Sequence, residues 1–243
     1  MTAAEPDLRR DTPITTRTLH RERVKVSQNV AVAIAQELRN PVFAIASAAQ
    51  LLRYRITDDP LVDKNIGRIL REAERLNGLV SSLVDYGRPA PVRLAPGDPD
   101  HVWAAVVENH RGALESRALL IHHTPAEPRA SCAIDDEQFA QACSHALVNA
   151  IDAAPEGSDL TISSTTASDG AWRSQLHNDG PPVRTDALPH VFELLFTTKP
   201  GHAGIGLAVA HRIVSEHGGT IALENADGGG ATLTLTLPAA HPI

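Results

Sequence analysis

The chain has 243 residues, of which 42% are hydrophobic and 21% charged, with a formal net charge of −7 at pH 7. This hydrophobic fraction supports one large or two smaller globular domains and argues against wholesale disorder. The negative charge provides no basic surface for nucleic acid, so we expect no nucleic-acid partner. Cys132 and Cys143 follow no disulfide or metal-ligand spacing, which suggests a reducing compartment. No apolar run approaches the ~20 residues of a membrane helix, so we expect a cytoplasmic chain without a membrane segment.

The N-terminal third predicts two long helices. Residues 1–18 show no periodicity and are expected to form a flexible arm. Helical periodicity then runs from about residue 18 to 55, and Thr57-Asp58-Asp59-Pro60 predicts a turn. The apolar positions of the first helix are Ile34, Leu38, Ile45, Ala48 and Leu52. Those of the second helix form a heptad seam of Ile66, Ile69, Ala73, Leu76, Val80 and Leu83.

Two such helices joined by a short connection predict an antiparallel helical hairpin. A hairpin by itself does not bury a heptad seam on both helices, so we expect a homodimer in which two hairpins form a four-helix bundle. The alternative is that the hairpin packs only on the rest of its own chain. Residues 87–91, Gly-Arg-Pro-Ala-Pro, end the second helix and place the boundary of the hairpin domain, residues 19–90, near residue 90.

The second domain, residues 91–243, has a different pattern. Its helical segments are 99–115, 136–154 and 204–217. Its strand candidates are 119–123, 131–134, 160–166, 172–176, 220–225 and 231–237, and residues 181–203 are irregular. Helices beside a mixed, mostly antiparallel sheet form an α/β sandwich. The predicted fold class of the whole chain is therefore α+β.

Four motifs in this domain suggest nucleotide chemistry. His145 and Asn149 lie four residues apart on one helix face, and an Asn side-chain oxygen suits Mg²⁺. Asn178-Asp179-Gly180 follows a strand, where glycine allows close approach of a flat ligand. The third motif is the segment 192–199, Phe-Glu-Leu-Leu-Phe-Thr-Thr-Lys. The fourth, residues 204–207, Gly-Ile-Gly-Leu, opens a helix whose free N–H groups suit phosphate.

In this order and spacing, the motifs resemble the N, G1, F and G2 boxes of the ATP-binding domain of histidine kinases. This GHKL superfamily also holds type II topoisomerases and Hsp90 chaperones. The resemblance implies ATP and Mg²⁺ as cofactors, Asn149 as the Mg²⁺ ligand, Asn178 as the adenine reader and residues 181–203 as a mobile lid. The residues it implies in ATP binding are His145, Asn149, Asp152, Asn178, Gly180, Phe196, Thr198, Lys199, Gly204, Ile205, Gly206 and Leu207.

The boxes depart from the family pattern at several positions. Asn178 stands where many members have Asp, and Pro182 replaces the second G1 glycine. Leu194-Leu195 replaces Pro-Phe in the F box, and His202 replaces the first G2 glycine. His145 occupies a position often held by Asn, where it either tunes nucleotide chemistry or packs.

Residues 36–41, Gln-Glu-Leu-Arg-Asn-Pro, resemble the His-Glu-Leu-Arg-Asn-Pro phosphoacceptor motif of the same family. The resemblance therefore implies the core of a two-component sensor histidine kinase, whose phosphoryl group passes to an Asp of a response-regulator receiver domain. An amide nitrogen is not nucleophilic, so Gln36 is predicted to block autophosphorylation. In the family pattern Glu37 is the general-base candidate, and Asn40 orients water for dephosphorylation of the regulator.

The glutamine at position 36 is compatible with two kinds of protein. Gln36 is either a substitution in an otherwise ordinary kinase or the mark of a natural pseudokinase, acting as a regulator phosphatase or a nucleotide-binding scaffold. Two further ATPase classes fit the sequence less well. A chaperone- or topoisomerase-type ATPase would have Glu at position 145, where this chain has His145. An anti-sigma-factor serine kinase would lack the helical hairpin.

Overall fold

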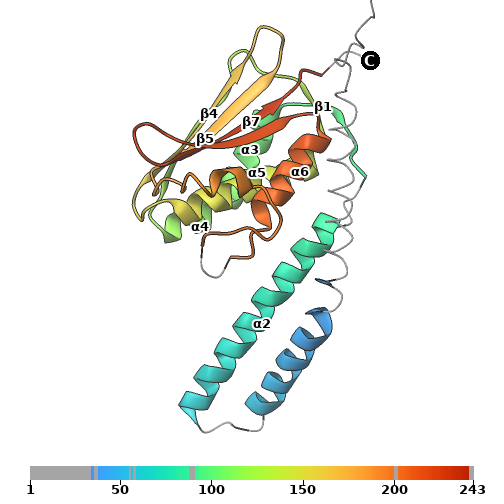
Figure 1. Cartoon of the computed structure of the whole chain (residues 1–243), viewed down its shortest axis with the longest axis vertical. Helices are drawn as coiled ribbons and strands as arrows, with labels where there is room; N and C mark the ends of the chain where they lie inside the picture. The colour runs from blue at the N-terminus through green and yellow to red at the C-terminus, as the bar shows by residue number, and fades with distance from the viewer. Residues whose placement is uncertain are drawn as a thin grey trace, which may run out of the picture. The chain divides into compact units, whose positions relative to one another are not determined.

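The computed structural model describes residues 34–35, 38–54, 56, 59–87, 91–199 and 202–240. The chain divides into two compact units, Met1–Ala90 and Pro91–Ile243 (Figure 1). The predicted N-terminal arm, Gln36 and Glu37 lie outside the described residues. In the part of the chain that is described, no helix is both long and apolar enough to cross a membrane.

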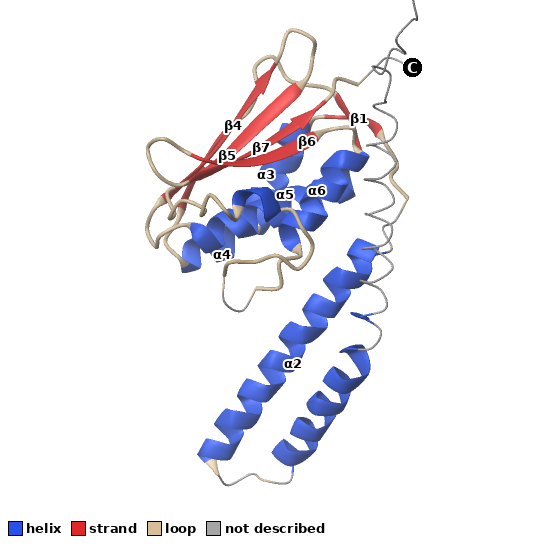
Figure 2. Ribbon diagram, in the orientation of Figure 1, coloured by secondary structure: helices blue, strands red, loops and turns tan. Residues whose placement is uncertain are grey.

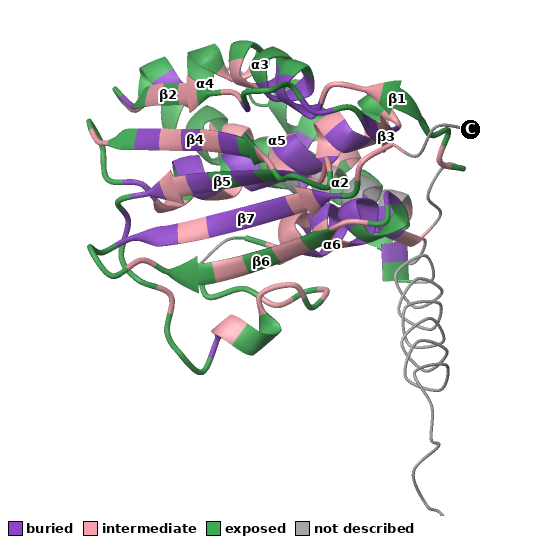
Figure 3. Ribbon diagram, turned by 90° about the horizontal axis from the view of Figure 1, so that it is seen from above, coloured by how far each residue is buried: buried purple, intermediate pink, exposed green. Residues whose placement is uncertain are grey.

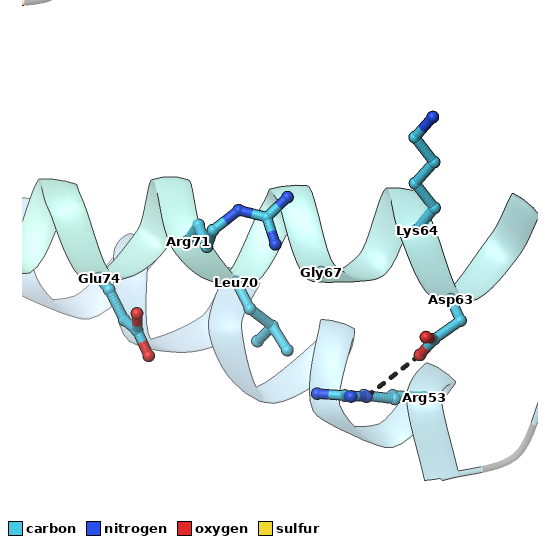
Figure 4. Close-up of a pocket in the computed structure, with 7 residues that line it drawn as sticks. All are labelled: Arg53, Asp63, Lys64, Gly67, Leu70, Arg71 and Glu74. Atoms are coloured by element: carbon cyan, nitrogen blue, oxygen red, sulfur yellow. Dashed lines mark ion pairs between the residues drawn. The ribbon is translucent and has the colours of Figure 1, made fainter. Parts of the chain in front are cut away.

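The first unit contains the predicted helical hairpin. Residues 38–54 are helical, with Pro41 inside this segment, and α2 spans Pro60–Gly87. Asp59 caps α2, because its Oδ1 accepts hydrogen bonds from the N–H groups of Leu61 at 2.9 Å and Val62 at 3.2 Å. Near the turn, Arg53 Nε lies 3.2 Å from Asp63 Oδ1 beside a shallow, charged hollow (Figure 4). Both side chains are more than half exposed, so this ion pair adds little stability.

Burial separates two apolar faces of the hairpin. The buried apolar residues of the described hairpin are Ala35, Val42, Ala49, Ile66, Ala73, Val80, Leu83 and Tyr86. A second set of apolar side chains at heptad spacing remains exposed in the single chain, and it includes Leu38, Ile45, Leu52, Ile69 and Leu76. The hairpin thus buries only part of the predicted seam, as expected for two helices alone.

The second unit is built on a five-stranded sheet with the order β2-β4-β5-β7-β6. β2 pairs with β4 in parallel, whereas the other pairs are antiparallel, which confirms the predicted mixed sheet. The strands are β2 (Leu120–Thr124), β4 (Asp159–Thr166), β5 (Trp172–Asn178), β6 (Thr220–Asn225) and β7 (Ala231–Leu237). A separate two-stranded antiparallel sheet joins β1 (Ala95–Gly97) to β3 (Cys132–Ile134).

Helices cover one face of the five-stranded sheet (Figure 2). They are α3 (Pro99–Asn109), α4 (Arg111–Ser116), α5 (Asp136–Ala153) and α6 (Gly206–Glu216), and a short 3₁₀ helix spans Leu188–His190. The core lies between these helices and the sheet, where Phe139 of α5 meets Trp172 of β5 edge-to-face at 5.9 Å. β7 is mostly buried, and its neighbour β6 forms an exposed edge (Figure 3). The α+β fold class is confirmed.

Several predicted boundaries were wrong. The single helix expected over 99–115 is two helices that meet at His110, whose ring Nδ1 lies 2.9 Å from the carbonyl oxygen of Val106. The helix expected from residue 204 begins at Gly206, because Gly204 has a φ of +66° that a right-handed helix does not accept. β5 continues to Asn178, two residues beyond the expected end.

Candidate functional site

The helix α5 presents the residues of the first motif. Asp135 caps its N-terminus, and its buried face includes Phe139, Leu147 and Ile151. Asn149 is partly exposed and Asp152 exposed, so both are available to the neighbouring segments of the unit. The periodicity of the apolar residues therefore fixes which side chains of this helix are accessible to a ligand.

The segment before α6 contacts this helix through two basic side chains. Lys199 Nζ donates hydrogen bonds to the backbone oxygen and to Oδ1 of Asn149, each at 3.1 Å. His202 Nε2 lies 3.0 Å from Asp152 Oδ2. Residues that are fifty positions apart in sequence thus meet along the last turns of α5.

The environment of Lys199 lowers the pKa of its ammonium below the ordinary value of 10.5. Burial is the main cause, because it disfavours the charged form, and the charge of Arg117 acts in the same direction. The carboxylate of Asp152 opposes both effects. Lys199 is therefore a desolvated cation held next to two oxygen atoms, which is a setting suited to an anionic ligand.

The second motif lies where β5 ends against α5. Asn178 is 5% exposed and is paired in register with Ala231 of β7. Its Oδ1 accepts a hydrogen bond from the N–H of Gly180 at 3.0 Å. A Cβ atom at Gly180 would lie 2.3 Å from the backbone oxygen of Ala153, so only glycine fits here. This glycine lets the chain after β5 touch the C-terminal turn of α5.

The third motif folds back on the fourth. Leu195 donates its N–H to the oxygen of Gly204 at 3.0 Å, and a Cβ atom at Gly204 would lie 2.2 Å from the oxygen of Phe196. The ring of Phe196 lies 5.6 Å from that of His190, and Thr198 is exposed. Close backbone contact, made possible by Gly204, therefore joins the two motifs.

The start of α6 faces the first motif. A Cβ at Gly206 would come within 3.3 Å of His145 Nδ1 on α5. The helix begins after Ile205 without a side-chain cap, and Leu207 is partly exposed. Uncapped N–H groups at a helix start attract anions. The G2-like glycines therefore bring such groups next to His145.

Four of the predicted motifs are thus brought together at one end of the second unit. At α5, Lys199 contacts Asn149, Gly180 lies against the oxygen of Ala153, and Gly206 lies next to His145. Asn40 belongs to the other unit, where it is exposed on the first helix, and Gln36 and Glu37 lie outside the described residues.

Two residues at this site have no role that the sequence pattern predicts. The pattern marks His202 only as a replaced glycine and does not single out Arg117. The signal for Arg117 is indirect: Pro155 follows α5 and leaves the carbonyl of Ile151 without its usual N–H donor, and Arg117 donates to that carbonyl instead.

Comparison with known families finds a match in each of the two units. A family described as "Histidine kinase-, DNA gyrase B-, and HSP90-like ATPase" matches residues 134–241. A second, the "His Kinase A (phospho-acceptor) domain", matches residues 28–91. The chain belongs to the two-component histidine kinases. It carries the two domains of their catalytic core, a phosphoacceptor-type hairpin and a GHKL-type ATPase domain.

Curated histidine kinases extend the likeness over nearly the whole chain. "Sensor histidine kinase ZraS" from Klebsiella oxytoca is 31% identical over 223 residues, covering 91% of this chain and 48% of that protein. "Sensory histidine kinase/phosphatase NtrB" from Rhizobium meliloti (strain 1021) is 28% identical over 222 residues, covering 83% of this chain and 56% of that protein. The chain thus spans about half the length of the curated relatives it matches.

Solved structures share the fold. Histidine kinase ThkA, solved in complex with response regulator protein TrrA, has a TM-score of 0.69 at 22% identity, covering 95% of this chain and 68% of that one. Full-length ShkA, solved in complex with AMPPNP, has a TM-score of 0.68 at 19% identity, covering 89% of this chain and 47% of that one.

Proposed function

We propose that this histidine kinase core binds Mg²⁺-ATP around the C-terminal half of α5 for phosphoryl transfer. The observation that carries the proposal is the contact of Lys199 with Asn149, which joins the F-box segment to the N-box helix. Lys199 and the backbone of residues 204–206 would donate to the phosphates. Asn178 Oδ1 has a second lone pair beside the one that Gly180 uses, and this lone pair suits the amino group of adenine.

Asn149 suits a magnesium ion. Its side-chain oxygen already attracts a cation, the Lys199 ammonium, at 3.1 Å, and Mg²⁺ prefers oxygen ligands that it shares with phosphates. When bound, the ion would neutralise charge on the phosphate oxygens. Lys199 would then release Asn149 and turn towards the phosphates, because two cations repel each other at one oxygen.

The hairpin would carry residue 36 at the position where the family has its phosphoryl-accepting histidine. Because Gln36 offers no nucleophilic nitrogen, the chain would bind nucleotide without forming a phosphohistidine there. We propose a homodimer as the working form, a response-regulator receiver domain as the partner, and a cytoplasmic location. The exposed seam on the hairpin supports the dimer, and the ThkA–TrrA complex is a precedent for the partner.

The test uses γ-labelled ATP with Mg²⁺ and three forms of the chain. Wild type should take up no acid-labile label, whereas Gln36→His should become labelled. The double variant Gln36→His with Asn149→Ala is the control, because it has an acceptor but lacks the proposed Mg²⁺ ligand, and it should stay unlabelled. Absence of label on Gln36→His would reject the kinase proposal for this ATPase domain.

A second activity, dephosphorylation of the regulator, is supported by Asn40. This residue is exposed on the first helix, and the relative NtrB is named a kinase/phosphatase. Wild type should then speed phosphate release from a phosphorylated receiver domain, and Asn40→Ala should not. If neither form speeds release, a nucleotide-binding scaffold is the remaining alternative.

A further inference from the structure

The C-terminal end of α5 is closed by an arginine from another helix. Pro155 has no N–H, so the carbonyl of Ile151 lacks the donor that residue i+4 would supply. Arg117, at the end of α4, supplies it: Nη1 donates to the Ile151 oxygen, and Nη2 donates to the Ala154 oxygen at 2.8 Å. The backbone oxygen of Arg117 in turn accepts the N–H of Gly157 at 3.1 Å. Three bonds thus fix the chain just after α5.

This end of α5 is also the centre of the proposed nucleotide site. Asn149, which Lys199 contacts, lies two residues before Ile151. The oxygen of Ala153 leaves no room for a side chain at Gly180. The Arg117 guanidinium therefore holds the turn on which the N-box and G1-box residues converge, without touching the candidate ligand residues themselves.

The charge at this position matters for an anionic ligand. The C-terminus of a helix carries a partial negative charge, which repels phosphate groups. A guanidinium bonded to the last carbonyls offsets that charge.

We propose that Arg117 is a positioning residue of the nucleotide site and that its charge selects for phosphate-bearing ligands. This inference rests on the proposed function. If Arg117 only stabilised the fold, its replacement would weaken the binding of adenosine, ADP and ATP by the same factor. If its charge selects for phosphate, the replacement would weaken the binding of each ligand in proportion to the charge of that ligand's phosphates.

The test compares the full chain with Arg117→Gln and Arg117→Lys. Affinities for adenosine, ADP and ATP would be measured by displacement of a fluorescent ATP analogue at low salt, together with thermal unfolding of each form. For Arg117→Gln we expect a loss of roughly tenfold for ATP, less for ADP, and within about twofold for adenosine. Arg117→Lys keeps the charge but not the two-pronged geometry, so it should regain most of the ATP-over-adenosine preference.

The matched control is Arg111→Gln. Arg111 is the first residue of α4, the helix that Arg117 follows; it pairs with Glu108 and is well exposed, so all three affinities should stay unchanged. Equal losses of adenosine, ADP and ATP in Arg117→Gln would overturn the inference while leaving the proposed function intact. A wild-type chain that binds none of the three would overturn the proposed function and this inference with it.

Discussion

At the scale of single residues, Lys199 shows how the site balances charge. Its ammonium is bound to two oxygen atoms of Asn149, and burial holds its pKa below the ordinary lysine value. A phosphate ligand favours the protonated form. Nucleotide affinity should therefore begin to fall once the pH exceeds the lowered pKa of the free protein, which occurs below pH 10.5.

The Lys199→Arg variant isolates this effect, because arginine stays charged throughout the range. We expect the ratio of wild-type to Lys199→Arg affinity for ATP to fall as the pH rises from 7 to 10, by up to about tenfold per unit above the lowered pKa. Fluorescence titration with a labelled nucleotide measures the ratio. A ratio that stayed constant even when the titration was extended past pH 10.5 would show that the Lys199 charge does not act on the phosphates.

Gly180 gives a prediction on stability. A methyl group there would lie 2.3 Å from the backbone oxygen of Ala153, the residue before Ala154, whose oxygen Arg117 binds. Gly180→Ala should therefore destabilise the second unit by ~1–3 kcal/mol through forced backbone strain. Gly228→Ala is the control, since nothing lies within 4 Å of its added methyl. Urea unfolding measures the free energy of unfolding of both variants. Equal values would mean that the turn after β5 shifts to accommodate the methyl group.

Residue-level predictions from sequence were limited by contacts that only folding creates. The motifs containing Asn149, Gly180 and Gly206 follow local rules of helix faces and turns, so they could be named in advance. The Arg117–Ile151 bond joins residues 34 apart, and no local pattern of arginine marks it. His202 likewise differs from the expected glycine, yet its pairing with Asp152 required the folded chain.

At the scale of elements, α3 is tied to the sheet through a buried carboxylate. Asp100 is 1% exposed, and its Oδ2 accepts hydrogen bonds from the N–H of Ala126 at 3.0 Å and from Trp172 Nε1 at 3.2 Å. His123 Nε2 lies 3.6 Å from its Oδ1. Burial raises the pKa of Asp100, but His123, Ser164 and these two donors outweigh it, so the net pKa lies below 3.8.

A lowered carboxyl pKa stabilises the folded state above the unfolded pKa, and this stabilisation is lost as the pH falls through the folded pKa. Asp100→Asn should cost ~1–3 kcal/mol at pH 7, and the difference from wild type should shrink below pH 3.8. Asp159→Asn, at a half-exposed carboxylate of β4, is the control. Urea unfolding at pH 7 and at acidic pH provides the data. A loss from Asp100→Asn that is the same at both pH values would contradict the linkage.

The predicted boundaries of helices and strands were wrong where a side chain or a proline acts against the local sequence pattern. β1 was not predicted, because it has three residues and contains Pro96, which cannot donate to a neighbouring strand. The break between α3 and α4 falls at His110, before Gly112, and the His110 ring bonds to the preceding turn. The strands β6 and β7 were predicted correctly, because three glycines separate two alternating stretches.

At the scale of the whole molecule, the described residues of the hairpin leave an apolar stripe exposed. Leu38, Ile45, Leu52, Ile69 and Leu76 are each at least 39% exposed. They repeat at the spacings that join helices in a bundle, and their burial would gain roughly 25 cal/mol per Å² of apolar surface. A second copy of the hairpin provides the same stripe, because a two-fold interface uses one surface twice.

The full chain should therefore have twice the 25.9 kDa mass of the monomer in sedimentation equilibrium. Ile69→Asp places a charge in the stripe and should yield the monomer, since an unpaired carboxylate in an apolar interface costs several kcal/mol. Leu61→Asp is the matched control: Leu61 lies on the same helix, is 67% exposed and falls outside the seam, so the dimer should persist. A monomeric wild type, or a dimer that tolerates Ile69→Asp, would mean that something other than a second hairpin covers the stripe.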